Sequence, residues 1–219
     1  MKQMLIIGFV LLSWVANAQR VETTQLWKQV YQHYMQDDLY LNIQIKNRQE
    51  YSQQTLLLDS TTISFIKKGA NTFYQSKEQD ILTTPNYYIW VSRTDSILTL
   101  REKNKSNLPS FITQLEKLDS LLQLHPLDLR EDANYWVFST GSTKYSTEIY
   151  VHQSDKTIHK IIYTYPSETS KIYTEVSYTN NLLSSLSPTL SFDVENYITK
   201  KRKGWKLNEL YKNYTLVVE

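Results

Sequence analysis

Four histidines are the residues best suited to proton transfer or metal binding near neutral pH. They are His33, His125, His152 and His159. His152 and His159 flank the turn Ser154-Asp155-Lys156, so a hairpin there would bring the two imidazoles across from each other. Zinc sites use three or four protein ligands, and two imidazoles alone are a weak site. A pair of histidines on the surface of two strands is the simpler interpretation, and we expect no metal site.

Two carboxylates and a serine-containing turn are the other residues with catalytic chemistry. Glu148 and Glu175 lie on candidate neighbouring strands, as the paired carboxylates of glycoside hydrolysis would. Carboxylates scattered along strands are usually solvated instead. The turn Ser139-Thr140-Gly141-Ser142 lacks the G-x-S-x-G form of a nucleophile elbow, and no phosphate-binding loop or dinucleotide fingerprint occurs. We therefore expect no enzyme and no cofactor.

The first residues have the pattern of an export signal. Lys2 precedes an apolar run over residues 4–15, and Ala16-Asn17-Ala18 is a small-x-small cleavage site. The run is too short for the roughly 20 residues of a spanning helix. We predict a signal peptide over residues 1–18 and a mature chain in the periplasm or outside the cell. The sequence has no cysteine, which excludes disulfides and predicts no lipid anchor at the mature N-terminus.

Composition predicts a β-rich chain with an ordinary hydrophobic core. Among the 219 residues are 17 Tyr and 5 Trp but only 4 Gly, and aromatic residues suit half-buried strands and the edges of cavities. The net charge of +2 gives no electrostatic footprint for nucleic acid or for an anionic membrane. One basic cluster, Lys200-Lys201-Arg202-Lys203, precedes Gly204-Trp205, and a solvated turn is favoured over a binding patch.

Apolar periodicity predicts two helices. In residues 21–36, Leu26, Val30 and Tyr34 recur every four residues, with Trp27 and Tyr31 beside them. The second helix follows Asn107-Leu108-Pro109 and ends at His125-Pro126. Its apolar face is formed by Phe111, Leu115, Leu118 and Leu122.

Most of the remaining chain alternates with the period of two that is typical of strands. Short turns separate these segments, which indicates an antiparallel meander of about ten to eleven strands. The expected strands are 41–46, 63–67, 72–76, 78–82, 86–92, 97–101, 135–139, 145–152, 157–165, 171–179 and 214–218. The apolar stripes of the helices favour a single curved sheet, an unclosed half-barrel that the two helices cover.

Some strands are apolar or aromatic on both faces. In residues 86–92, Tyr87, Ile89 and Val91 alternate with Tyr88 and Trp90. One interpretation is a ligand cavity inside the half-barrel. The other is an outer face that is rich in tyrosine because tyrosine is a good strand former.

The order of elements resembles the periplasmic lipoprotein carrier (LolA-like) superfamily. The similar segments include residues 63–69, Phe73-Tyr74, residues 85–91 and Ile97-Leu98. Residues 149–158 are similar to the paired strands after the family's central helix, and residues 192–198 to its closing segment. The resemblance implies one half-barrel domain over residues 19–219, with helices as a lid over an apolar cavity.

The function implied is that of a soluble, monomeric binding protein that holds a lipoprotein or lipid acyl chain. The candidate ligand-binding residues are Leu41, Ile43, Phe65, Tyr88, Trp90, Leu98, Ile149, Ile162 and Val176, with Leu115 and Leu118 from the lid. The alternative is an envelope sensor or protein-interaction module on the same fold. Its exposed Tyr and Trp would contact an envelope protein partner.

Overall fold

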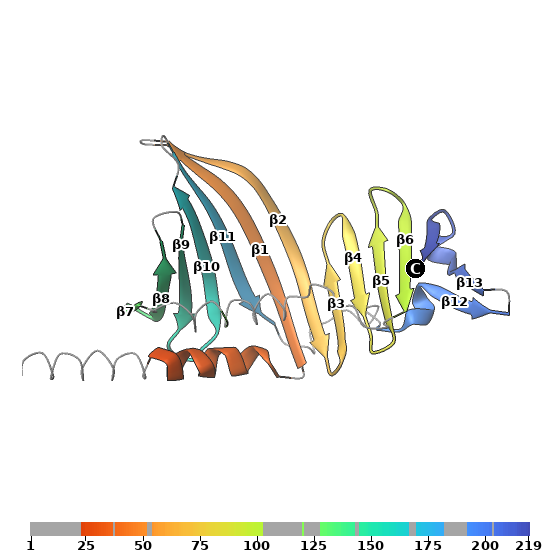
Figure 1. Cartoon of the computed structure of the whole chain (residues 1–219), viewed down its shortest axis with the longest axis horizontal. Coiled ribbons are helices and arrows are strands. Elements are labelled where there is room, and N and C mark those ends of the chain that lie inside the picture. Colours follow the sequence, from red (N-terminus) through yellow and green to blue (C-terminus); the bar gives the residue numbers. More distant parts are fainter. Residues whose placement is uncertain are drawn as a thin grey trace, which may run out of the picture. The chain divides into compact units, whose positions relative to one another are not determined.

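The computed structural model describes residues 23–36, 38–51, 54–102, 120, 128–142, 145–166, 170–181, 192–202 and 204–219. The predicted signal peptide lies outside these residues. The chain, whose strands are labelled in Figure 1, divides into two compact units. Unit 1 takes its residues from 1–35, 47–56 and 110–175, and unit 2 from 36–46, 57–109 and 176–219.

One sheet holds most of the strands, in the order β14-β6-β5-β4-β3-β2-β1-β11-β10-β9-β8-β7. It is unclosed, because the two strands at its ends, β14 and β7, do not pair with each other. Its members are β1 (Asp38–Tyr51), β2 (Gln54–Lys68), β3 (Asn71–Gln75), β4 (Gln79–Thr83), β5 (Tyr87–Ser92), β6 (Ile97–Glu102), β7 (Asp128–Asp132), β8 (Tyr135–Gly141), β9 (Ser146–His152), β10 (Ile158–Pro166), β11 (Lys171–Asn180) and β14 (Thr215–Val218). A separate hairpin pairs β12 (Ile198–Lys201) with β13 (Gly204–Leu207).

The expected number and direction of the strands need correction. The sheet has 12 strands instead of ten to eleven, because the sequence Asp-Leu-Arg-Glu-Asp of β7 is too charged to show alternation. The sheet is also not wholly antiparallel, since β14 pairs parallel to β6, with Thr215 opposite Ile97 and Val218 opposite Leu100. A hairpin turn forces its strands to be antiparallel, but a long connection does not. More than a hundred residues separate β6 from β14.

The described residues contain one α-helix, over residues 23–34, and not the two that were expected to cover the sheet. Apart from Ser120, the segment of the second expected helix lies outside them. The predicted apolar stripe of the first helix is confirmed: Trp27, Val30 and Tyr34 are all buried. Trp27 packs edge-on against Phe138 of β8 at 5.7 Å between ring centroids. The Ile158 N–H donates to the Tyr34 hydroxyl at 2.7 Å, which fixes the helix against the start of β10.

Of the helices that the structure describes, none combines the length and the apolar composition that crossing a bilayer requires.

The core of unit 2 lies on one face of strands β2 to β6. Strand pairing aligns one side chain from each strand in a continuous line, and all of them are buried. In order across the sheet they are Ile66, Phe73, Leu82, Ile89 and Leu100. The C-terminal segment covers this face, with Tyr197 and Ile198 buried against it. The segment includes two short 3-10 helices, η2 (Val194–Asn196) and η3 (Glu209–Tyr211).

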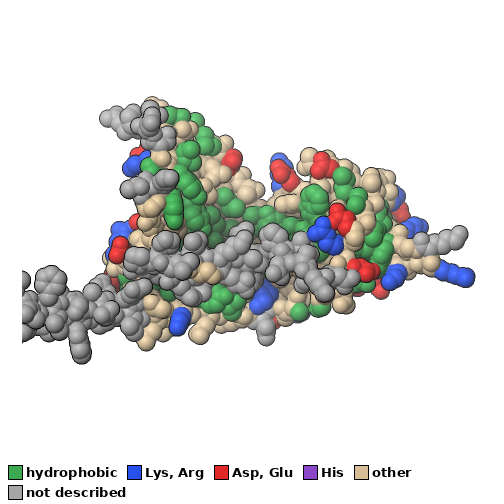
Figure 2. Space-filling model, viewed as in Figure 1, with side chains coloured by type: hydrophobic (Ala, Val, Ile, Leu, Met, Phe, Trp, Pro, Cys, Tyr) green, Lys and Arg blue, Asp and Glu red, His purple; other side chains and the backbone are tan. Residues whose placement is uncertain are grey.

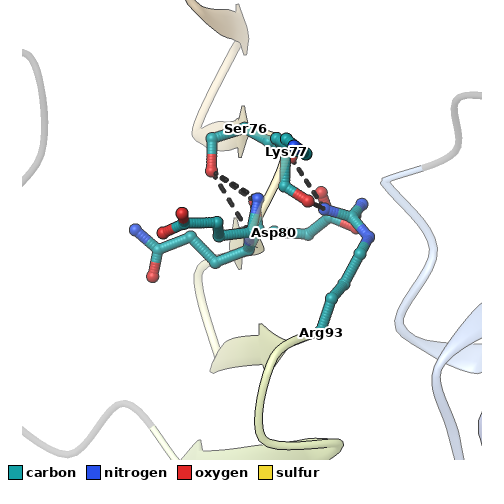
Figure 3. Close-up of polar contacts among 6 residues, drawn as sticks. Ser76, Lys77, Asp80 and Arg93 are labelled. Atoms are coloured by element: carbon teal, nitrogen blue, oxygen red, sulfur yellow. Dashed lines mark hydrogen bonds and ion pairs between the residues drawn. The ribbon is translucent and has the colours of Figure 1, made fainter. Parts of the chain in front are cut away.

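An ion pair between the half-buried Arg93 and the buried Asp80 interrupts this apolar face (Figure 3). Arg93 Nη2 lies 2.5 Å from Asp80 Oδ2, and Arg93 Nη1 donates to the Ser76 carbonyl at 2.7 Å. Asp80 Oδ1 has no hydrogen-bond partner among the described residues. Burial, and then the charge of Asp80, raise the pKa of the Tyr211 phenol. The phenol therefore stays protonated beside the pair.

Candidate functional site

The opposite face of the same strands in unit 2 is also apolar. Phe65, Tyr74, Ile81 and Trp90 are aligned directly across β2, β3, β4 and β5, and Thr99 of β6 is next in line. We call the first four residues the apolar row. Phe65 is buried and the other three are half-buried. With a strand spacing of about 4.8 Å, the line from Phe65 to Thr99 is roughly 19 Å long.

Three predicted ligand-binding residues extend this face. The Ser64 hydroxyl donates to Asn42 Oδ1 at 3.1 Å, which places these two side chains on the core face. Because side chains alternate along a strand, Leu41 and Ile43 of β1 lie on the other face, with Phe65. Tyr88 lies there too, two residues from Trp90 on β5. The structure thus brings together Leu41, Ile43, Phe65, Tyr88 and Trp90 on one face of unit 2.

Polar contacts hold the β5 and β6 end of this face. Trp90 Nε1 donates to Gln79 Oε1 at 2.8 Å, which fixes the plane of the indole. Tyr88 is paired with Arg101 across β5 and β6, and Arg101 forms an ion pair with Glu219. Burial raises the pKa of Tyr88. The site therefore combines an apolar row with a neutral phenol and a paired cation at one end.

The remaining predicted ligand-binding residues are not part of this group. Leu98 is opposite Val91, so it lies on the core face of unit 2. In unit 1, Ile149 is buried opposite Phe138, whereas Ile162 is half-buried opposite Glu148. Val176 is half-buried on β11 in unit 2. Leu115 and Leu118 lie outside the described residues.

His152 and His159, which flank the predicted turn, do come together in unit 1. The ring centroids of His152 and His159 are 5.1 Å apart, and Tyr135 stacks on His159 at 5.0 Å. Burial, followed by the neighbouring His152 and Lys160, lowers the pKa of His159. No group of three or more His, Cys, Asp or Glu able to hold a metal occurs in the part of the chain that the structure describes.

The two carboxylates proposed for glycosidic chemistry have separate basic partners in unit 1. Arg130 Nη2 lies 3.0 Å from Glu148 Oε1, and the Tyr150 hydroxyl donates to Glu148 Oε2 at 3.1 Å. Glu175 Oε2 lies 3.7 Å from Arg48. Each carboxylate is thus neutralised by an arginine.

Two residues of the apolar row, Tyr74 and Ile81, were not among the predicted ligand-binding residues. Both lie in strands that alternation predicted correctly. The missing information was the register between strands, because only the alignment with Phe65 and Trp90 places them in one line. Alternation gives the face within one strand but not the match between neighbours.

Comparison with known proteins gives structural neighbours only. No protein-family model matches the chain, and no curated protein matches it significantly. An uncharacterized conserved protein from Thermus thermophilus is 9% identical over 90% of this chain and 99% of its own, with a TM-score of 0.40. A DUF1329 family protein from Desulfovibrio piger is 10% identical over 80% and 98%, with a TM-score of 0.37.

A LolA superfamily protein from Nitrosomonas europaea is a further neighbour. It is 9% identical over 64% of this chain and 84% of its own, with a TM-score of 0.26. The superfamily that the order of elements in the sequence resembles is thus among the structural neighbours.

Proposed function

We propose that this chain is a periplasmic or secreted binding protein that holds an acyl chain, or another apolar ligand, along the apolar row of unit 2. The alignment of Phe65, Tyr74, Ile81 and Trp90 across four strands carries the proposal. The export pattern of residues 1–18 supports the location. The ligand class is the one that the LolA-like resemblance implies.

The length of the row suits an acyl chain. One leaflet is half of the roughly 30 Å hydrocarbon core of a bilayer, so a single acyl chain extends about 15 Å. The roughly 19 Å from Phe65 to Thr99 accommodates that length. Each methylene removed from water contributes about 0.8 kcal/mol, so ten of them contribute about 8 kcal/mol when fully buried. That exceeds the lower estimates of the cost of association, about 4 kcal/mol.

Tryptophan fluorescence with a brominated fatty acid tests the position of the ligand. Bromine quenches a nearby indole, so dibromostearic acid bound along the apolar row should quench Trp90. We expect saturable quenching of the mature protein and loss of most of it in Trp90→Phe. The matched control is Trp136→Phe, which removes a half-buried tryptophan of β8 in unit 1 and should leave the quenching in place. Equal quenching in both variants, or none in the unaltered protein, would refute the proposal.

A polar substitution in the middle of the row gives a second test. Ile81→Asn should weaken fatty-acid binding at least tenfold, because the acyl chain would cover an amide that lacks a partner. Ile172→Asn alters an exposed isoleucine in unit 1 and should bind as the unaltered protein does. Circular dichroism verifies that both variants fold. Native mass spectrometry of protein purified from the envelope should show the mass of a bound lipid.

A second candidate function is protein interaction, and an exposed strand segment in unit 2 favours it. Strand β3 pairs with β2 only from Ser64 onward, and residues 57–62 of β2 are exposed. Leu57 and Leu58 are 53% and 49% exposed on opposite faces. Such a segment can accept an added strand from a partner. A stoichiometric partner that survives delipidation and is lost in Leu57→Lys would favour this function over lipid binding.

A further inference from the structure

Three residues of the basic cluster, Lys200, Lys201 and Arg202, lie at the tip of a hairpin in unit 2. Lys201 is opposite Gly204, and Lys200 is opposite Trp205. Gly204 has a φ of 128°, a conformation that side-chain-bearing residues rarely adopt, so glycine allows the tight return of the chain. Lysine and arginine side chains project at this end of unit 2 (Figure 2). Lys200 and Lys201 are exposed, and so is Arg202 in the turn.

A groove of about 670 Å³ lies beside this hairpin. That volume is within the usual range of small-ligand sites, roughly 300–1,000 Å³. The groove is formed by the hairpin, η3 and β14. Its lining residues are Thr199, Lys201, Trp205, Lys206, Leu207, Asn208, Glu209, Lys212, Tyr214 and Leu216. Three of them are lysines and one is a glutamate, while indole, phenol and leucine side chains provide apolar surface.

The charges of the groove favour an anion. Lys212 Nζ lies 2.7 Å from Glu209 Oε1, so this pair is neutral. Lys201 and Lys206 form no ion pair with any described residue, and both are exposed. Lys200 does not line the groove, and its Nζ lies 5.3 Å from the centroid of the Trp205 ring. Glu219, just after β14, is paired with Arg101. The other acidic residues of the C-terminal segment, Asp193 and Glu195, do not line the groove.

An exposed leucine stands next to the basic groove. Leu210 is the middle residue of η3, and its side chain is 81% exposed. A large apolar side chain in water beside several lysines is the combination that binds at an anionic bilayer surface. The lysines are attracted to lipid phosphates, and the leucine leaves water for the acyl boundary. A free phosphate ligand would not account for the exposure of Leu210.

We propose that this groove binds the phosphate headgroup of an anionic phospholipid, with Leu210 in the bilayer surface, so that unit 2 docks on anionic membranes. The docking site is separate from the apolar row. Trp205 packs against Tyr87 at 5.5 Å, and Tyr87 lies on the face of β5 opposite to Trp90. The net charge of the whole chain does not reveal the site, because the 22 Asp and Glu nearly balance the 24 Lys and Arg wherever these lie in the sequence.

Vesicle flotation of the mature protein tests the proposal. The probes are vesicles of roughly three parts phosphatidylethanolamine to one part phosphatidylglycerol, and matched vesicles with phosphatidylcholine in place of phosphatidylglycerol. We expect at least tenfold more protein on the anionic vesicles at about 0.05 M salt, and loss of that excess at about 0.5 M salt. Equal binding to both vesicles, or no binding to either, would overturn the proposal.

Variants locate the site. Lys201→Gln with Lys206→Gln should lower binding to anionic vesicles at least fivefold. Lys68→Gln with Lys77→Gln removes the same charge from exposed positions elsewhere in unit 2 and should bind as the unaltered protein does. If both pairs lower binding equally, the attraction comes from net charge and the groove is not the site.

Two further measurements separate membrane docking from binding of a soluble ligand. Leu210→Ser should weaken vesicle binding severalfold but leave its salt dependence, because only the apolar contact is lost. Glycerol phosphate in solution should bind far more weakly than the vesicles; tight binding of glycerol phosphate without vesicle binding would indicate a soluble ligand and overturn the proposal. Quenching by dibromostearic acid should be unchanged in the lysine variants, so failure of docking and failure of acyl binding are distinguishable.

Discussion

Replacing Arg93 with Met removes the cation beside Asp80 but keeps most of the volume of the side chain. The Asp80 side chain is only 8% exposed, and its Oδ1 already lacks a partner among the described residues. The substitution leaves the whole carboxylate buried without compensation. Breaking a buried pair on one side costs about 3–5 kcal/mol, and because Arg93 itself is 35% exposed we expect about 3 kcal/mol. Urea unfolding followed by tryptophan fluorescence measures this loss as a lower midpoint.

Two comparisons decide whether burial is the cause. Arg101→Met breaks an ion pair whose side chains are 38% and 44% exposed, and should cost less than about 1 kcal/mol. The double variant Asp80→Leu with Arg93→Met removes both charges and should recover most of the stability lost in Arg93→Met. Burial of Asp80 is not the cause if Arg93→Met lowers the free energy of unfolding no more than Arg101→Met does. The same holds if the double variant is no more stable than Arg93→Met.

Three further predictions concern unit 1. Tyr34→Phe removes the acceptor of the buried Ile158 N–H and should lower the free energy of unfolding by about 1–2 kcal/mol; urea denaturation checks this, and an unchanged midpoint would contradict it. Trp27→Ala creates a cavity beside Phe138, and should cost about 3–5 kcal/mol by the same measurement, whereas Lys28→Ala on the exposed side should cost little. Burial and His152 lower the pKa of His159, so protonation favours the unfolded state. The stabilisation is complete above the unfolded pKa of about 6.5 and is lost as the pH falls through it toward the lower folded value. Unfolding midpoints at about pH 7.5 and about pH 5.5 should therefore differ less in His159→Gln than in the unaltered protein.

Local patterns predicted the elements well where one face is buried. The N-terminal helix follows from the spacing of Val30 and Tyr34, and strands β3 to β6 follow from alternation between turns. Residues 57–62 of β2 were not predicted as a strand, because both of their faces are exposed and no apolar–polar alternation results. These residues are nevertheless extended, because they continue the same strand as residues 64–68, which pair with β3.

Long-range partners could not be predicted from local patterns. The strands β4 and β5 are apolar on both faces because the C-terminal segment covers one of them with Tyr197 and Ile198. The two-sided pattern in the sequence is compatible with a cavity or with a tyrosine-rich outer face. Neither interpretation included a segment more than a hundred residues away. Lys200 and Lys201 of the basic cluster lie in β12, and Arg202 lies in the turn after it. The groove beside them depends on β14, whose position comes from its pairing with β6.

The parallel pairing of β14 with β6 also constrains how unit 2 folds. Thr215 contacts the strand that begins at Ile97, and the Glu219 N–H donates to the Leu100 carbonyl at 2.9 Å. Contacts between such distant residues require closure of a long loop and form slowly. Strands β2 to β6 can pair early through short hairpins. Their core face stays exposed to water until the C-terminal segment, including Tyr197 and Ile198, packs against it. Unit 2 therefore completes its fold only after β14 has paired with β6.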